Sequence, residues 1–132
     1  MSRRPAARTA KGKLPRRQAE TPAALEAVIA ACSERKAVNG LVLDLHPLTD
    51  ATDYFVIVSG TSDTHVRAIA DHVIETLKDA GIRPYQVEGL QQGRWVLVDY
   101  VDFVVHVFHP TLRSFYQLEG LWGDAPQRKL AL

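Results

Sequence analysis

An unbroken apolar run, Phe-Val-Ile-Val at residues 55–58, constrains the fold more than any other feature. It shows no polar alternation, so it predicts a strand at residues 53–59 that is buried on both faces. A turn of small residues follows, in which Ser62 or Asp63 can cap a helix, and then an apolar stripe at helical spacing that Gly81 terminates. The members of this stripe are Val66, Ile69, Ala70, Val73 and Leu77. A buried strand leading into an amphipathic helix predicts an α/β protein with helices packed on a sheet.

The remaining elements fit the same class. A helix is expected to begin at Thr21-Pro22 and to end at Asn39-Gly40, and a short helix is expected after His109-Pro110. Further strands are predicted at residues 41–45, 84–87, 94–99 and 102–108. The order α-β-β-α-β-β-β-α predicts a mixed, about five-stranded sheet flanked by helices, and 132 residues suit one domain.

The charge is distributed unevenly. Residues 1–20 hold seven Lys or Arg and one Glu, a net charge of +6, whereas the remaining nine basic and fourteen acidic residues give −5. We therefore expect a basic, disordered tail at 1–20, a folded domain at 21–124 and a polar tail at 125–132. The basic tail leaves two further interpretations open, which are unspecific contact with RNA and an organellar targeting sequence.

Composition excludes several classes of protein. The single cysteine, Cys32, cannot form an intramolecular disulfide, and no Cys/His cluster has zinc-ligand spacing. No apolar run reaches the ~18 residues that a membrane span needs. We therefore expect a cytoplasmic protein, apart from the targeting alternative, with no metal and no cofactor.

One enzymatic interpretation remains as an alternative. The turn from Ser59 to Asp63 resembles the Gly-Ser turn of nucleotidyltransferases, which pair it with two carboxylates at i and i+2 on one strand. Here the nearest pair is Asp99 and Asp102, and side chains three apart on a strand point in opposite directions. We therefore predict no catalytic residues, and keep a nucleotidyltransferase-like enzyme as the alternative.

Five separate blocks resemble the Iojap/RsfS family of ribosomal silencing factors, in family order and at family spacing. The longest reads DYFVIVSGTSDTHVRAIAD, and the C-terminal one reads FYQLEGLW. The blocks lie at residues 53–71, 87–89, 95–100, 104–108 and 115–122. The resemblance extends over residues 22–124, about four-fifths of the chain.

The resemblance implies a translational repressor that acts under starvation. Members bind the large ribosomal subunit through ribosomal protein L-fourteen, block association with the small subunit, and often form homodimers. It also implies a fold related to nucleotidyltransferases but without the catalytic carboxylates. This agrees with the missing carboxylate pair.

We expect the partner to be bound by aromatic and acidic side chains of the C-terminal half, because Trp and Tyr are frequent at interface hot spots. The expected residues are Trp95, Tyr100, Asp102, Tyr116, Glu119 and Trp122. For Trp95 and Tyr116, a core position and an interface position are equally expected. His106 is predicted to be a hydrogen-bonded, half-buried histidine. Val101 stands where the family usually has glycine, so either the turn differs here or glycine is not needed for a left-handed conformation.

Overall fold

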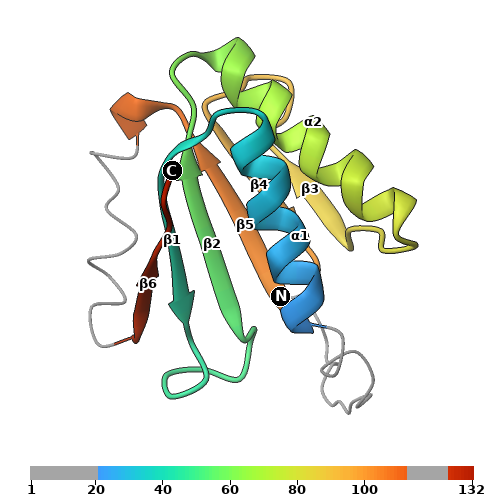
Figure 1. The fold of residues 1–132 in the computed structure, drawn as a ribbon, viewed down its shortest axis with the longest axis vertical. Coiled ribbons are helices and arrows are strands. Elements are labelled where there is room, and N and C mark those ends of the chain that lie inside the picture. The colour runs from blue at the N-terminus through green and yellow to red at the C-terminus, as the bar shows by residue number, and fades with distance from the viewer. Residues whose placement is uncertain (1–20, 113–124) are drawn as a thin grey trace.

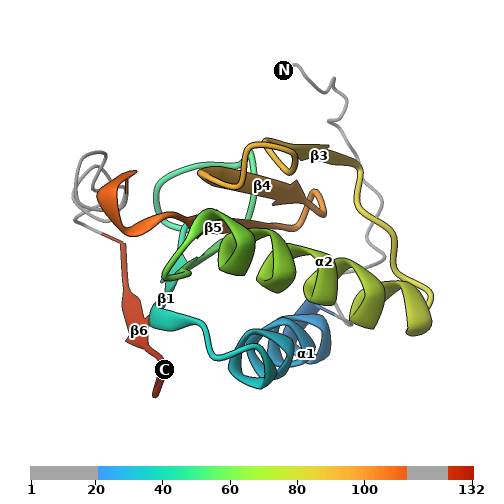
Figure 2. The ribbon, with the colours of Figure 1, turned by 90° about the horizontal axis from the view of Figure 1, so that it is seen from above.

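The computed structural model describes residues 21–112 and 125–132. It contains one six-stranded sheet with both described helices on one face (Figures 1 and 2). The elements in chain order are α1 (Thr21–Glu34), β1 (Val38–Asp44), β2 (Tyr54–Ser59), α2 (Asp63–Asp79), β3 (Gln86–Glu88), β4 (Trp95–Asp99), β5 (Phe103–Phe108) and β6 (Gln127–Lys129). The predicted mixed α/β class is confirmed.

The strands lie in the order β3-β4-β5-β2-β1-β6. Only β2 and β5 pair in parallel, and the other pairs in this sheet are antiparallel. β2 and β5 occupy the two central positions, and every residue of β5 is buried. This explains why β2 is an apolar run as far as Val58 and why β5 is apolar except for His106.

The expected count of about five strands misses β6. The sequence assigned residues 125–132 to a polar tail, but Gln127–Lys129 pair with Leu41–Leu43 of β1. The chain then continues along α1's side of the sheet, where Leu130 and Leu132 pack against the helix-side core. Gly40 makes room for them, since a Cβ there would lie 2.6 Å from Leu132 Cδ1.

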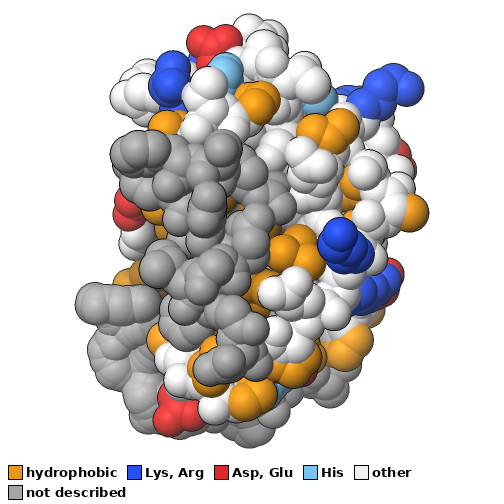
Figure 3. Space-filling model, turned by 90° about the vertical axis from the view of Figure 1, so that its left-hand side faces the viewer, with side chains coloured by type: hydrophobic (Ala, Val, Ile, Leu, Met, Phe, Trp, Pro, Cys, Tyr) orange, Lys and Arg blue, Asp and Glu red, His pale blue; other side chains and the backbone are white. Residues whose placement is uncertain are grey.

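The two faces of the sheet carry separate apolar clusters. The helix-side cluster joins α1 and α2 to strand residues that include Val56, Val58, Val96, Val98, Val105 and Val107. The second cluster lies on the opposite face and contains Leu41, Leu43, Leu45, Ile57, Phe108 and Ala125. Phe55, Trp95 and Leu112 pack against the second cluster while only partly buried. Figure 3 faces the β6 side of the molecule and shows hydrophobic side chains reaching the surface there.

The first helix ends earlier than its sequence predicts. α1 stops at Glu34, and Asn39-Gly40, expected to terminate it, belong to β1. Asn39 does adopt a left-handed conformation, with φ of 56°, but it does so at an irregularity in the pairing with β2 between Val38 and Leu41. The Asn-Gly pair therefore marks a β-bulge rather than a helix end.

The second helix matches its prediction closely. The Ser62 side chain caps α2 by accepting a hydrogen bond from the His65 backbone N–H at 3.1 Å. Gly81 follows the helix with φ of 83°. Cys32 of α1 is fully buried, and burial raises its thiol pKa to about 12. No helix among the described residues is long and apolar enough to cross a membrane.

Val101 occupies a left-handed position in the turn between β4 and β5. Its φ is 73°, so a left-handed conformation forms at this position without glycine. The Asp99 carboxylate accepts a hydrogen bond from the Val101 N–H at 2.8 Å, and Thr52 Oγ1 donates to the Val101 carbonyl at 2.9 Å. These contacts hold Val101 in a left-handed conformation that is unfavourable for a β-branched residue.

Replacing Val101 with glycine is therefore expected to stabilise the fold. The left-handed conformation costs an L-residue about 1–2 kcal/mol, and glycine avoids this cost. The greater conformational entropy that glycine loses on folding offsets about 0.5–1 kcal/mol of the gain. The Val101 side chain is 38% exposed, so little packing is lost. Thermal unfolding should show Tm rising by a few degrees. Val101→Ala, which retains Cβ, is the control and should gain much less. A lower Tm for Val101→Gly would contradict this account.

Candidate docking surface on the sheet

Trp95 begins β4 and faces away from the helices. Its strand neighbours Val96 and Val98 point into the helix-side core, whereas Trp95 packs against the second cluster. The indole stacks on Phe108 of the adjacent strand, with ring centroids 4.9 Å apart and an interplanar angle of 30°. Because Trp95 is only partly buried, it presents apolar area at this face while its ring packs on Phe108.

His106 lies next to Trp95 on the same face. His106 is only 4% exposed, so it is more deeply buried than the half-buried position that the sequence predicted. Nδ1 accepts a hydrogen bond from the Trp95 indole N–H at 3.1 Å, and Phe55 meets the imidazole edge-on at 4.5 Å. Burial lowers the pKa of His106 to about 3, which keeps the ring neutral at pH 7.

The hydrogen bond with Trp95 fixes the tautomer of His106. Since Nδ1 accepts, the single ring proton of the neutral imidazole must be on Nε2. Nε2 is buried, and among the described residues it has no hydrogen-bond partner. Sequence reasoning can place His106 and Phe108 on one side of their strand, because they are two residues apart. It did not find the contact with Trp95, which depends on the register that aligns Trp95 with Phe108 and Leu97 with His106.

Tyr100 does not lie on this surface, and its expected exposure is wrong. It is 7% exposed, belongs to the helix-side core and stacks on Phe103 at 5.0 Å. Burial raises the pKa of its phenol to about 12. Side chains alternate between the two faces along a strand. Tyr100 comes five residues after Trp95, an odd number, so the two side chains lie on opposite faces of the sheet.

Of the other expected docking residues, only Asp102 lies in the described part of the chain. Asp102 is half-buried in the β4–β5 turn, at the end of β4 opposite Trp95. Its backbone is held there, because the Asp102 N–H donates to the Tyr100 carbonyl and its carbonyl accepts from Asp53. Tyr116, Glu119 and Trp122 lie outside the described residues. The structure therefore brings Trp95 together with His106, Phe108 and Phe55, and separates it from Asp102.

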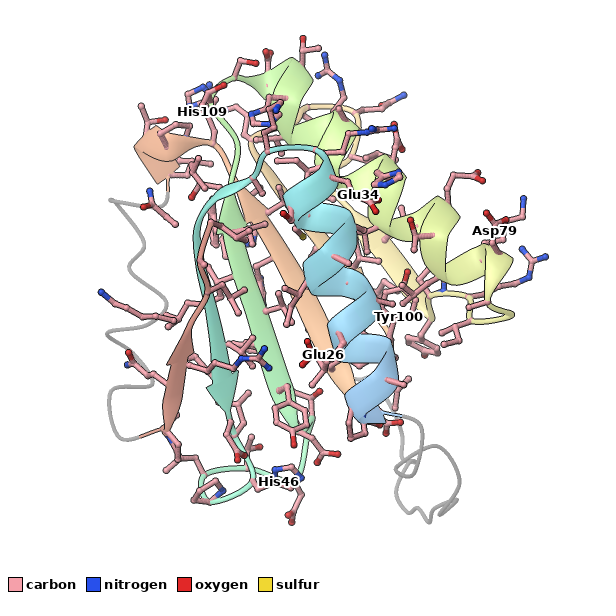
Figure 4. The ribbon with its side chains drawn as sticks, viewed as in Figure 1. Glu26, Glu34, His46, Asp79, Tyr100 and His109 are labelled. Carbon is pink, nitrogen blue, oxygen red and sulfur yellow. The ribbon has the colours of Figure 1, made fainter. Side chains whose placement is uncertain are left out.

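The enzymatic alternative lacks the geometry that it requires. Gly60 follows β2 and donates its N–H to the Phe108 carbonyl at the end of β5. Asp102 immediately precedes Phe103, the first residue of β5, which pairs with Tyr54. Six residues of strand separate the two ends, about 20 Å. Figure 4 shows the same separation, with His109 at one end of the sheet and Tyr100 toward the other. Neither Asp99 nor Asp102 converges on the Gly60 turn.

One further cluster of polar side chains lies near the Asp102 end of the sheet. His46 Nδ1 is 2.7 Å from Asp44 Oδ1, and His46 Nε2 is 3.3 Å from Asp53 Oδ1. The hydrogen bond from His46 lowers the pKa of Asp44. The histidine thus joins the end of β1 to the start of β2. Within residues 21–112 and 125–132, no group of three or more His, Cys, Asp or Glu could hold a metal ion.

Comparison with known proteins gives a consistent result. The family model described as "Ribosomal silencing factor during starvation" matches residues 18–132. The chain is 46% identical over 102 residues to the ribosomal silencing factor RsfS of Bacillus subtilis, covering 77% of this chain and 86% of the relative. It is 33% identical over 101 residues to the mouse protein named mitochondrial assembly of ribosomal large subunit protein 1, covering 74% of this chain and 44% of the relative.

Solved structures agree with the fold. A protein from Chromobacterium violaceum superposes with a TM-score of 0.76 at 34% identity, covering 84% of this chain and 92% of its own. A protein from Bacillus halodurans superposes with a TM-score of 0.74 at 36% identity, covering 83% of this chain and 99% of its own. The family match extends through β6, beyond the segment in which the sequence resemblance was found. On this match and these identities, the chain belongs to the RsfS family of ribosomal silencing factors.

Proposed function

We propose that this protein represses translation by binding ribosomal protein L-fourteen on the large ribosomal subunit and excluding the small subunit sterically. The observation that carries the proposal is membership of the RsfS family. The name of the mouse relative, which refers to the large ribosomal subunit, supports that subunit as the partner. No chemical step is involved, in keeping with the separation of Gly60 from both aspartates.

The face of the sheet opposite the helices is the proposed docking surface. Trp95 and Phe55 are partly buried against the second cluster, and such aromatic side chains supply much of the binding energy at protein interfaces. Residues 21–132 carry a net charge of −5, which complements a basic ribosomal protein. Asp102, Tyr116, Glu119 and Trp122 remain proposed contributors, and the burial of Tyr100 argues against a direct contact there.

Steric exclusion gives a defined energetic effect. A factor that binds only the free large subunit opposes subunit association by RT ln(1 + [factor]/Kd), about 2.7 kcal/mol at 100 times Kd. The repression therefore depends on the concentration of the factor and needs no catalytic turnover. The homodimer that the family resemblance implies would compete with this binding if the two interfaces overlap.

Sedimentation of ribosomes tests the proposal directly. Full-length protein should co-sediment with free large subunits and not with assembled ribosomes, and purified L-fourteen added in excess should release it. A protein that lacks residues 1–20 is the control, and its affinity should stay within about tenfold because screened charges contribute modestly at physiological salt. Equal recovery with assembled ribosomes would rule out steric exclusion, and an interaction lost with residues 1–20 would favour RNA binding instead.

A further inference from the structure

His106 is an energetically costly residue in its position. The other five residues of β5 are Phe or Val, and all six are buried. Within the described part of the chain, the Nε2–H of His106 finds no acceptor, and an unsatisfied buried donor costs about 1–3 kcal/mol. An apolar side chain would avoid that cost, so the histidine needs another explanation than the stability of the sheet.

The other nitrogen of the imidazole ring, Nδ1, makes the specific contact that an apolar residue could not make. His106 Nδ1 accepts a hydrogen bond from the Trp95 indole N–H at 3.1 Å, while the Phe108 ring stacks on the indole. An indole held by stacking alone can still slide and rotate over its neighbour. The hydrogen bond adds a direction, and it fixes which edge of Trp95 is turned inward and which is presented outward.

We propose that His106 is a positioning residue for docking, which acts through Trp95 by holding the indole in the orientation that the partner contacts. The inference rests on the proposed function, since it concerns the same surface. A preorganised side chain loses less entropy when the partner binds, so the affinity is higher than for a rotating indole. The buried ring remains neutral, so its Nδ1 acceptor is available at any pH at which the cell works.

The test replaces His106 by leucine and by glutamine. Leucine fills an apolar site without an acceptor, whereas the glutamine carbonyl oxygen can still accept from the indole. We expect His106→Leu to weaken binding to purified L-fourteen about tenfold, without loss of stability in urea unfolding. His106→Gln should remain within about threefold of the parent. In addition, the Trp95 indole N–H resonance should shift and exchange faster with water in His106→Leu only.

A double-mutant cycle separates positioning from a general effect on the surface. In a Trp95→Phe background the indole N–H is gone, so adding His106→Leu should change the affinity by less than about threefold. A full tenfold loss in that background, or unchanged affinity of His106→Leu in the parent, would overturn the inference. A parent protein that fails to bind L-fourteen at all would instead overturn the proposed function, and the inference with it.

Discussion

Truncating Trp95 to alanine is expected to weaken binding to L-fourteen by at least about 2 kcal/mol, roughly thirtyfold. Among the described residues, the indole is the largest side chain on the face opposite the helices, and it stacks on Phe108 before the partner arrives. The loss should appear mainly as faster dissociation, because buried aromatic contacts govern residence time while charge governs encounter. Isothermal titration and dissociation kinetics with purified L-fourteen measure both quantities.

Tyr85→Ala is the matched control for this prediction. Tyr85 is also aromatic and is 60% exposed, but it precedes β3 beside Asp99, at the opposite end of β4 from Trp95. Its truncation should change the affinity by less than about threefold. Urea unfolding of Trp95→Ala tests its packing role, since a fully core tryptophan would cost about 3–5 kcal/mol of stability. A folded Trp95→Ala protein with parental affinity would place the docking surface elsewhere.

The order of elements from α1 to β5 was predictable from sequence because their patterns are strong and local. The apolar run of β2 indicates a buried strand, and the apolar stripe of α2 indicates a helix with one buried face. Ser62 indicates where that helix begins. Together with the family resemblance, they were enough to predict a mixed sheet flanked by helices.

β6 could not be predicted in this way. Its three residues, Gln127–Lys129, are polar and exposed, so they show no apolar pattern. The strand exists because its backbone pairs with β1, and Arg128 forms a salt bridge of 2.8 Å with Glu26 of α1. An edge strand with charged side chains is a common way to end a sheet, and its sequence resembles that of a tail.

The contacts of the proposed docking surface follow from the sequence only in part, for a related reason. Trp95 and His106 meet because the β4–β5 turn aligns Trp95 with Phe108, and that register depends on the left-handed conformation of Val101. A valine at this position gives no sequence signal for such a turn. The side of Tyr100, in contrast, follows from its odd separation from Trp95, once β4 is known to begin at Trp95.

Lowering the pH from 7 to 5 is expected to remove about 2 kcal/mol from the free energy of unfolding through His106 alone. Burial lowers the pKa of His106 from 6.5 to about 3, so the folded protein does not take up this proton at pH 5. The unfolded chain takes it up below pH 6.5. Because the unfolded state then binds more protons, stability falls with the pH from about 6.5 down to about 3.

His106→Leu isolates this contribution. The parent and the variant share every other titrating group, so the difference between their pH profiles belongs to position 106. The carboxylates of Asp44 and Glu26 have lowered pKa values because of hydrogen bonds from His46 and Arg128. Their stabilising effect is present above the ordinary carboxyl pKa and is lost only at more acidic pH, outside the window of 5 to 7.

Urea unfolding at pH 5, 6 and 7, followed by circular dichroism, measures the effect. The parent should lose about 2 kcal/mol more than His106→Leu between pH 7 and pH 5, with the slope concentrated below pH 6.5. Equal slopes would mean that folded His106 accepts a proton, which the burial of Nε2 and the bond from Trp95 to Nδ1 both oppose. Retention of the indole resonance at pH 5 would then show that the contact with Trp95 persists while the protein loses stability.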